Sequence, residues 1–233
     1  MRPSVPIDRA MSKLGLASRA EARALIHAGK VRVNGKVVRE VKERIKLNSR
    51  IQISDAPAHP APAHLRTGAP AHQRVIIAFN KPRGVVTTTK DPEGRPTVFG
   101  VLAERGMTDR LLAIGRLDMA STGLLLLTND NELLNSLTDP VNGVERKYAV
   151  TVRGRVSPEA AAALPAARVE LRKASGPESH LLVTLTQGKN REIRNMFEEI
   201  GHEVTRLHRV EFGPISLGKL QPGDWIDVTE RFP

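Results

Sequence analysis

The 233-residue sequence contains no cysteine. This absence excludes disulfide bonds, thiol catalysis and cysteine-ligated zinc sites, and it is typical of proteins from a reducing compartment. The sequence also lacks an apolar run of the ~18 residues that a membrane span needs, and its N-terminus lacks the apolar stretch of a secretory signal. From these absences we expect a soluble cytoplasmic protein with no membrane partner.

Aromatic residues are scarce, at 3% of the chain, whereas basic residues are abundant and unevenly distributed. The first 54 residues contain 13 Lys or Arg and four acidic residues, which gives them a net charge of +9 out of the +11 of the whole chain. A compact basic segment joined to a nearly neutral body predicts a module that binds a polyanion. Because this segment has no aromatic residue, we expect it to bind through phosphate contacts and RNA shape.

The basic segment has the pattern of a small RNA-binding fold. Ile7, Met11 and Leu14 predict a short helix, and Ser18 with Glu21 predicts the capped start of a second helix. Residues 31–37 predict a hairpin, because an Asn-Gly pair at 34–35 accepts the positive φ angles of a tight turn. With further strands expected in 45–53, this order resembles the S4 RNA-binding domain. We expect RNA contacts from its basic side chains, namely Arg9, Lys13, Arg19, Arg23, Lys30, Arg32 and Lys36.

Residues 55–74 are rich in Ala and Pro and have no apolar periodicity, so they predict a flexible tether. His59, His64 and His72 lie in this segment. We expect no metal site there, because nothing in a flexible segment would fix the geometry of the three imidazoles. The expected organisation is an S4-like domain at 1–54, a linker at 55–74 and a catalytic domain at 75–233.

The larger domain combines many strands with a few short helices. Strands are expected at 75–79, 111–114, 124–127, 147–153, 181–186, 204–210, 215–217 and 225–228. Helices are expected up to Leu102, over 131–137 and over 193–200, where apolar residues recur at i, i+3, i+4 and i+7. This mixture predicts an α+β fold built on a largely antiparallel sheet.

The polar turn between the apolar runs 111–114 and 124–127 contains Arg116 and Asp118. By spacing alone such a pair is more often a surface ion pair or an Asx turn than a catalytic site. However, Gly-Arg-Leu-Asp at 115–118, followed by Ser-Thr-Gly-Leu-Leu-Leu-Leu-Thr at 121–128, closely resembles the signature of the RsuA-like family of ribosomal-RNA pseudouridine synthases. The resemblance implies that Asp118 is the catalytic residue. Two upstream blocks, 80–84 and 91–98, resemble the same family, and the second is closer to its large-subunit branch.

Two further blocks resemble motifs of this family. In 145–148, Tyr148 matches the tyrosine that lies against the target base. In 188–197, Arg194 matches the basic residue that pairs with the catalytic carboxylate, whereas Glu192 stands where glutamine is usual. The resemblance therefore implies a catalytic set of Asp118, Tyr148 and Arg194. We expect additional RNA contacts in this domain from Lys81, Arg116, Lys189 and Arg191.

The implied reaction breaks the N1–C1′ bond of a uridine, turns the uracil and rejoins it through C5. Because no atom is gained or lost, we expect no cofactor and no metal. Asp118 is suited both to addition at C1′ and to removal of a sugar proton, and Tyr148 is placed to cover the uracil and take the C5 proton. The target uridine must be unpaired or flipped out.

The expected partner is ribosomal RNA, 23S rather than 16S, either free or in a subunit assembly intermediate, and we expect the protein to act as a monomer. The alternatives are a 16S-directed synthase and a non-catalytic RNA-binding assembly factor that keeps this fold. An RNA methyltransferase is disfavoured because the chain has no G-x-G-x-x-G after a strand.

Overall fold

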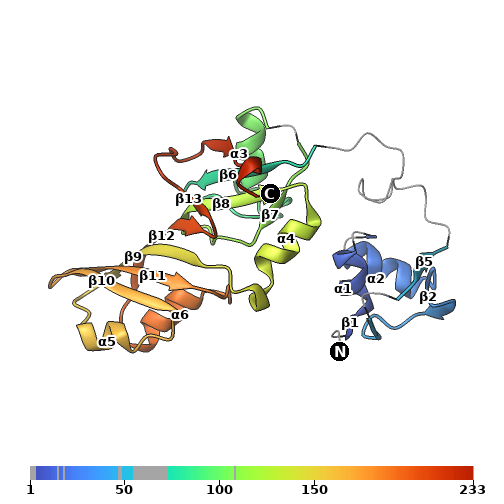
Figure 1. Ribbon diagram of the computed structural model, residues 1–233, viewed down its shortest axis with the longest axis horizontal. Coiled ribbons are helices and arrows are strands. Elements are labelled where there is room, and N and C mark those ends of the chain that lie inside the picture. Colours follow the sequence, from blue (N-terminus) through green and yellow to red (C-terminus); the bar gives the residue numbers. More distant parts are fainter. Residues whose placement is uncertain are drawn as a thin grey trace. The chain divides into compact units, whose positions relative to one another are not determined.

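The computed structural model describes residues 4–14, 16–17, 19–46, 49–54, 73–107 and 109–232. It divides into two compact units, Met1–Gln73 and Arg74–Pro233 (Figure 1). The capping role expected for Ser18 lies outside the described residues, as does the side chain of Lys13. Residues 55–72 of the tether expected at 55–74, with its three histidines, also lie outside them.

The first unit packs two helices, α1 (Ile7–Lys13) and α2 (Arg19–His27), against short strands. The strands are β1 (Ser4–Pro6), β2 (Val31–Val33), β3 (Lys36–Val38), β4 (Arg44–Lys46) and β5 (Ile51–Ile53). They pair as β1–β4 and as β3–β2–β5. Asn34 and Gly35 have φ angles of 49° and 85°, so the predicted hairpin is confirmed together with its physical reason.

The second unit is built on a nine-stranded sheet in the order β10–β11–β9–β12–β8–β6–β14, with β7 paired to β8 and β13 paired to β12. Only β12 and β8 are parallel, which confirms the predicted α+β class with a largely antiparallel sheet. The strands are β6 (Ile76–Lys81), β7 (Leu112–Ile114), β8 (Thr122–Thr128), β9 (Arg146–Arg153), β10 (Arg168–Ala174), β11 (Glu178–Leu185), β12 (Val204–Phe212), β13 (Ile215–Ser216) and β14 (Trp225–Asp227).

Helices cover both faces of this sheet. One apolar core includes Phe79 and Leu125 from the sheet together with residues of α3 (Val98–Glu104), α5 (Pro158–Ala162) and α6 (Glu192–Glu199). A second core, on the opposite face, joins Leu124 and Leu126 to α4 (Asn131–Thr138), β13 and the residues around the 3₁₀ turn η3 (Thr229–Arg231). The alternation of side chains along β8 therefore supplies both cores, which explains why its four consecutive leucines are all buried.

The sheet has a narrow junction at the start of β8. There, β12 pairs with β8 only at Thr122 and Gly123, and β7 takes the same edge of β8 from Leu126 onward. The strands β9–β12 are thus joined to β6–β8 through two residue pairs. Gly123 has a φ of +100°, and a Cβ placed on it would come within 2.3 Å of the Arg209 carbonyl oxygen, so glycine is what permits this close approach.

Candidate active site

Asp118 lies in the loop between β7 and β8, and the backbone of this loop is held on both sides of the carboxylate. The Gly84 amide donates to the Met119 carbonyl at 2.8 Å. The Thr87 hydroxyl donates to the Leu117 carbonyl at 2.9 Å and accepts from the Leu117 amide at 3.4 Å. The segment after β6 therefore fixes the backbone that carries Asp118.

The structure brings Asp118 and Arg194 together, as expected. Nε of Arg194 and Nη1 of Arg191 each lie 3.9 Å from Oδ2 of Asp118. The Arg194 side chain is only 13% exposed, against 40% for Asp118, and its Nη1 donates to the Val204 carbonyl at 2.7 Å. Burial and the nearby Arg191 charge lower the pKa of Arg194, and the Asp118 charge opposes this shift. A guanidinium stays protonated at neutral pH, so Asp118 has a buried, oriented counter-charge.

Lys81, from which we expected a contact with RNA, is buried. Its side chain is completely buried, and Nζ donates to the carbonyl oxygens of Ser121 at 2.8 Å and Pro82 at 3.1 Å. Burial lowers the pKa of Lys81 to about 8, against the opposing charge of Asp118. The expected contact between Lys81 and RNA phosphate does not fit this position. The physical reason is that both faces of β6 are covered, and Lys81 lies on the same face as Ile77 and Phe79, which the first apolar core covers.

Arg191 and Lys189 lie at the N-terminus of α6, and both are exposed. Arg191 occupies the N-cap position with a φ of 50°. Glu192, at the position where the family usually has glutamine, accepts from the Lys189 amide at 3.0 Å. Here the carboxylate closes the loop before the helix.

Tyr148 belongs to a row of residues that crosses four strands. The register pairs Tyr148 of β9 with Arg209 of β12, Arg209 with Gly123 of β8, and Gly123 with Lys81 of β6. Directly paired residues share one face of a sheet, so the row lies on the face that α6 covers. Within the described part of the chain, Tyr148 contacts Arg209 and makes no hydrogen bond with Asp118 or Arg194.

Sequence reasoning missed Arg209. It falls inside a segment that we predicted correctly as a strand, and its side chain is only 2% exposed. The available signal was a basic residue within a strand that is largely apolar on its inward face.

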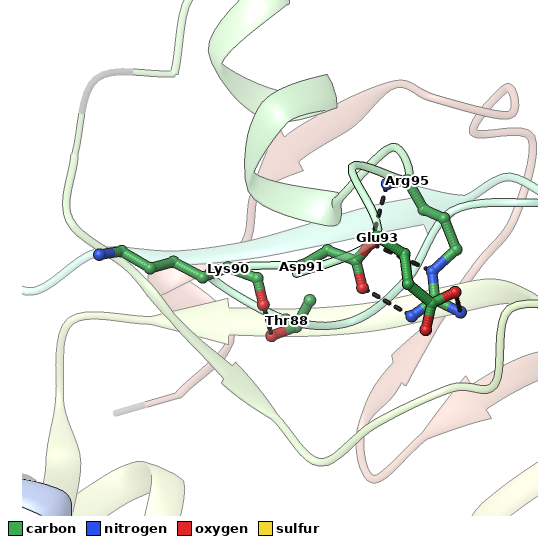
Figure 2. Close-up of polar contacts among 5 residues, drawn as sticks. All are labelled: Thr88, Lys90, Asp91, Glu93 and Arg95. Atoms are coloured by element: carbon green, nitrogen blue, oxygen red, sulfur yellow. Dashed lines mark hydrogen bonds and ion pairs between the residues drawn. The ribbon is translucent and has the colours of Figure 1, made fainter.

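The loop 88–95 begins beside the Asp118 loop and is held by charged side chains (Figure 2). Asp91 accepts from Arg95 Nη2 at 2.6 Å, from Arg95 Nε at 3.1 Å and from the Arg95 amide at 2.8 Å. Arg95 also pairs with Glu93 at 2.9 Å. The hydrogen bond from Arg95 holds the pKa of Asp91 below its ordinary value. Figure 2 shows the Lys90 ammonium pointing away from this cluster.

In the N-terminal unit, Arg19 and Arg23 both bind the buried carboxylate of Asp8, each at 3.0 Å. Burial raises the pKa of Asp8, but the hydrogen bonds from the two arginines outweigh this effect and leave it below the ordinary value. Both arginines remain more than half exposed. Other basic residues named from the sequence are exposed, namely Arg9, Arg32, Lys36 and Arg116, and Lys30 is partly buried.

Neither a membrane-spanning helix nor a metal-binding cluster occurs among the residues that the structure describes. No helix among them is both long and apolar enough to cross a membrane. Across the same residues, no group of three or more His, Cys, Asp or Glu is arranged to hold a metal ion.

Comparisons with known proteins agree with this geometry. Residues 75–199 match the family model described as RNA pseudouridylate synthase, and residues 5–51 match the S4 domain. The chain is 37% identical over 237 residues to ribosomal large subunit pseudouridine synthase B of Yersinia pestis, covering 95% of this chain and 72% of that protein. Its identity to the protein of the same name from Escherichia coli K12 is 37% over 240 residues, covering 97% of this chain and 79% of that protein. A crystal structure described as a pseudouridylate synthase aligns with a TM-score of 0.60 and 26% identity, over 98% of this chain and 97% of the other.

Proposed function

Because the chain belongs to the RNA pseudouridylate synthase family and carries an S4 domain, we propose that it converts a uridine of large-subunit ribosomal RNA to pseudouridine. The large-subunit assignment is supported by two relatives that are 37% identical and are named for that subunit. The observation that carries the proposal is Asp118, held in a fixed loop 3.9 Å from the buried Arg194.

In the proposed reaction, the C1′–N1 bond of the uridine breaks, the uracil rotates, and a C1′–C5 bond forms. C5 loses a proton and N1 gains one, so the product is an isomer of the substrate and no cofactor is consumed. An ionised Asp118 serves this reaction either by adding to C1′ or by removing a sugar proton. Arg194 favours the ionised carboxylate in a site that bound RNA would dry.

Tyr148 and the exposed basic residues complete the proposed site. Tyr148 covers the uracil, and its hydroxyl oxygen receives the C5 proton while its own proton passes on to N1, which requires the uridine to be turned out of the RNA stack. Arg116, Lys189 and Arg191 are exposed and suit contacts with phosphate, and Arg191 lies 3.9 Å from Asp118. Lys81 takes a different role and holds the Ser121 carbonyl beneath the loop.

We propose the same division of labour that the sequence predicts. Residues 1–54 bind RNA, 55–74 tether this module, and 75–233 carry out the reaction. Asp118, Arg194 and Tyr148 all lie within residues 75–233, and we propose that the protein acts as a monomer. An rRNA substrate, free or in an assembly intermediate, supports a cytoplasmic location.

The proposal is tested on rRNA from cells that lack this protein. The RNA is incubated with the wild-type protein or with Asp118→Asn, which keeps the size of the side chain but removes its charge. Carbodiimide-dependent primer extension across both large rRNAs then locates any pseudouridine. We expect one new stop in 23S rRNA with wild type and none with Asp118→Asn.

Other outcomes contradict the proposal in different ways. A new stop in 16S rRNA would overturn the subunit assignment, and a stop that persists with Asp118→Asn would overturn the role of Asp118. If both proteins bind rRNA tightly and neither produces a stop, the non-catalytic assembly factor becomes the better explanation.

A further inference from the structure

Arg209 is a buried cation whose hydrogen-bonding capacity is only partly used. Its Nε donates to the Leu124 carbonyl at 2.6 Å, and its guanidinium lies 5.1 Å from the centre of the Phe212 ring. Nη1 lies 3.4 Å from the Tyr148 hydroxyl oxygen. Nη2 is buried and has no hydrogen-bond partner among the described residues. A buried donor without an acceptor is costly, so this arrangement calls for an explanation.

Arg146 provides an instructive contrast. It is also buried and lies over Phe212, with 4.7 Å between its guanidinium carbon and the ring centre. Its Nη atoms donate to the carbonyl oxygens of Leu137, Val144 and Thr186, so both Nη atoms are hydrogen-bonded to the backbone. Arg146 thus links three segments of the chain. Arg209 instead places Nη1 beside the Tyr148 hydroxyl and has no partner for Nη2 among the described residues.

The position of Arg209 connects the two parts of the proposed site. Its backbone pairs with Tyr148 on one side and with Gly123 on the other. Gly123 lies five residues after Asp118, and the missing Cβ lets the Arg209 backbone approach β8 closely. Arg209 is therefore the residue through which Tyr148 is placed relative to the strand that follows Asp118.

We propose that Arg209 is a positioning residue that orients the Tyr148 hydroxyl for proton transfer, an inference that rests on the proposed function of Asp118 and Tyr148. Nη1 donates to one lone pair of the phenol oxygen from within the sheet, which leaves the other lone pair free to receive the C5 proton. In this arrangement Arg209 does not touch the RNA. Its effect should therefore appear in the rate of the reaction and not in RNA affinity.

The test is a double-mutant cycle on the full chain, with wild type, Arg209→Lys, Tyr148→Phe and the double variant. Single-turnover rates are measured at saturating rRNA, and RNA dissociation constants are measured separately. We expect Tyr148→Phe to be slower by about 10²-fold or more, within the range typical of proton-transfer groups, and Arg209→Lys to be slower by about tenfold, both with unchanged RNA affinity. The double variant should be no slower than Tyr148→Phe, because Arg209 acts through the hydroxyl that this substitution removes.

Arg146→Lys is the matched control, since it alters a buried arginine on the same aromatic ring without altering a donor to Tyr148. Arg146→Lys should change the single-turnover rate by the same factor in the wild-type protein and in Tyr148→Phe. If Arg209→Lys fails to fold, as judged by thermal melting, Arg209→Gln, which keeps a side-chain donor, takes its place in the cycle.

A spectroscopic measurement separates this inference from the proposed function. The chain has a single tyrosine, so ¹³C-tyrosine labelling gives one NMR signal. We expect Arg209→Lys to shift that signal and Arg146→Lys to leave it nearly in place. An unshifted signal, additive rate losses, or a Tyr148→Phe protein as fast as wild type would each overturn the inference. A wild-type protein that forms no pseudouridine would overturn the proposed function, while the NMR signal would still report the contact.

Discussion

Two buried cations flank the point where β8 leaves the active-site loop. Lys81 and Arg209 lie on either side of Gly123 in the row that crosses the sheet. Lys81 holds the loop backbone at the Ser121 carbonyl, and Arg209 contacts Tyr148. Neither cation is exposed enough to bind RNA. We propose instead that Lys81 supports the loop that carries Asp118 and that Arg209 supports Tyr148.

At this scale the sequence points to the residues proposed for the reaction but does not identify the buried cations beside them. Asp118 and Arg194 lie in family motifs, and the structure brings them within 3.9 Å. The role of Lys81 was mistaken and Arg209 was missed, because a charged residue in a strand gives only a weak local sign of burial, from the apolar residues that alternate with it. Its exposure depends on which strands flank it and which helix covers its face, and these are long-range properties of the fold.

We predict that Gly123→Ala destabilises the protein by about 3 kcal/mol, because a Cβ there combines a positive φ with a clash against the neighbouring backbone. Gly106→Ala is the matched control. Gly106 also has a positive φ, of 79°, but nothing lies within 4 Å of its Cβ position, so the cost should be about 1 kcal/mol. Urea denaturation measures both, and equal losses would show that the close approach to Arg209 is unimportant.

Among the elements, the loop 88–95 is the clearest case of order without regular secondary structure. The β-bridge between Val86 and Thr97 brings the two ends of this loop together. Within the loop, Arg95 forms ion pairs with Asp91 and Glu93. Because Thr87 is bonded to Leu117, the base of the loop is fixed next to Asp118. A stiff loop at this position suits a surface that packs against RNA close to the target uridine.

We predict that Asp91→Asn loosens this loop and lowers kcat/KM severalfold, with little change in melting temperature. Hydrogen exchange of the 88–95 amides measures the loosening, and exchange as slow as in wild type would contradict the prediction. Glu93→Gln is the control, since Glu93 is exposed and makes only the outer contact with Arg95, so its effect should be smaller. The pKa of Asp91 is lowered from 3.8, so the clamp is present above that pH and is lost as the pH falls through the lowered value.

The regular elements were predictable where their apolar periodicity is strong. Strands β6, β8, β9, β11 and β12 and helices α3, α4 and α6 all overlap the expected regions, and their ends differ from the expected ends by at most three residues. Helix α5 and strand β10 were missed. The first is a five-residue, alanine-rich turn of helix, and the second is an edge strand with a bulge between Leu171 and Lys173 and mixed polar residues. The sequence before and within α5 does favour a helix start, because Ser157 is the N-cap and Pro158 follows it, so only the shortness of the helix hid it. In β10, tertiary contacts decide a strand that the local sequence barely favours.

For the molecule as a whole, charge and chemistry are assigned to different parts of the chain. Residues 1–54 carry a net charge of +9, whereas the residues proposed for the reaction lie in 75–233. The two units have separate apolar cores. This separation predicts that RNA affinity and reaction rate can be altered independently.

We predict that deletion of residues 1–54 weakens rRNA binding and flattens its salt dependence, while Asp118 remains competent at saturating RNA. The slope of log K against log salt should fall by about 0.7–0.9 for each phosphate that the shortened protein no longer neutralises. A full-length variant with Lys30, Arg32 and Lys36 changed to Gln is the matched control, because it removes charge and keeps the module. An unchanged affinity and salt slope after deletion would contradict the prediction.

The narrow junction of the sheet has a consequence for how the enzyme tolerates change. Asp118 and Lys81 belong to the β6–β8 side, whereas Tyr148, Arg194 and Arg209 belong to the β9–β12 side. The site is therefore assembled from two halves that meet through Thr122 and Gly123. Because both halves also contribute to one apolar core, a change in the packing of either half alters their mutual alignment. In such a protein, a change that misaligns the two halves should lower the reaction rate before unfolding of either half can be detected.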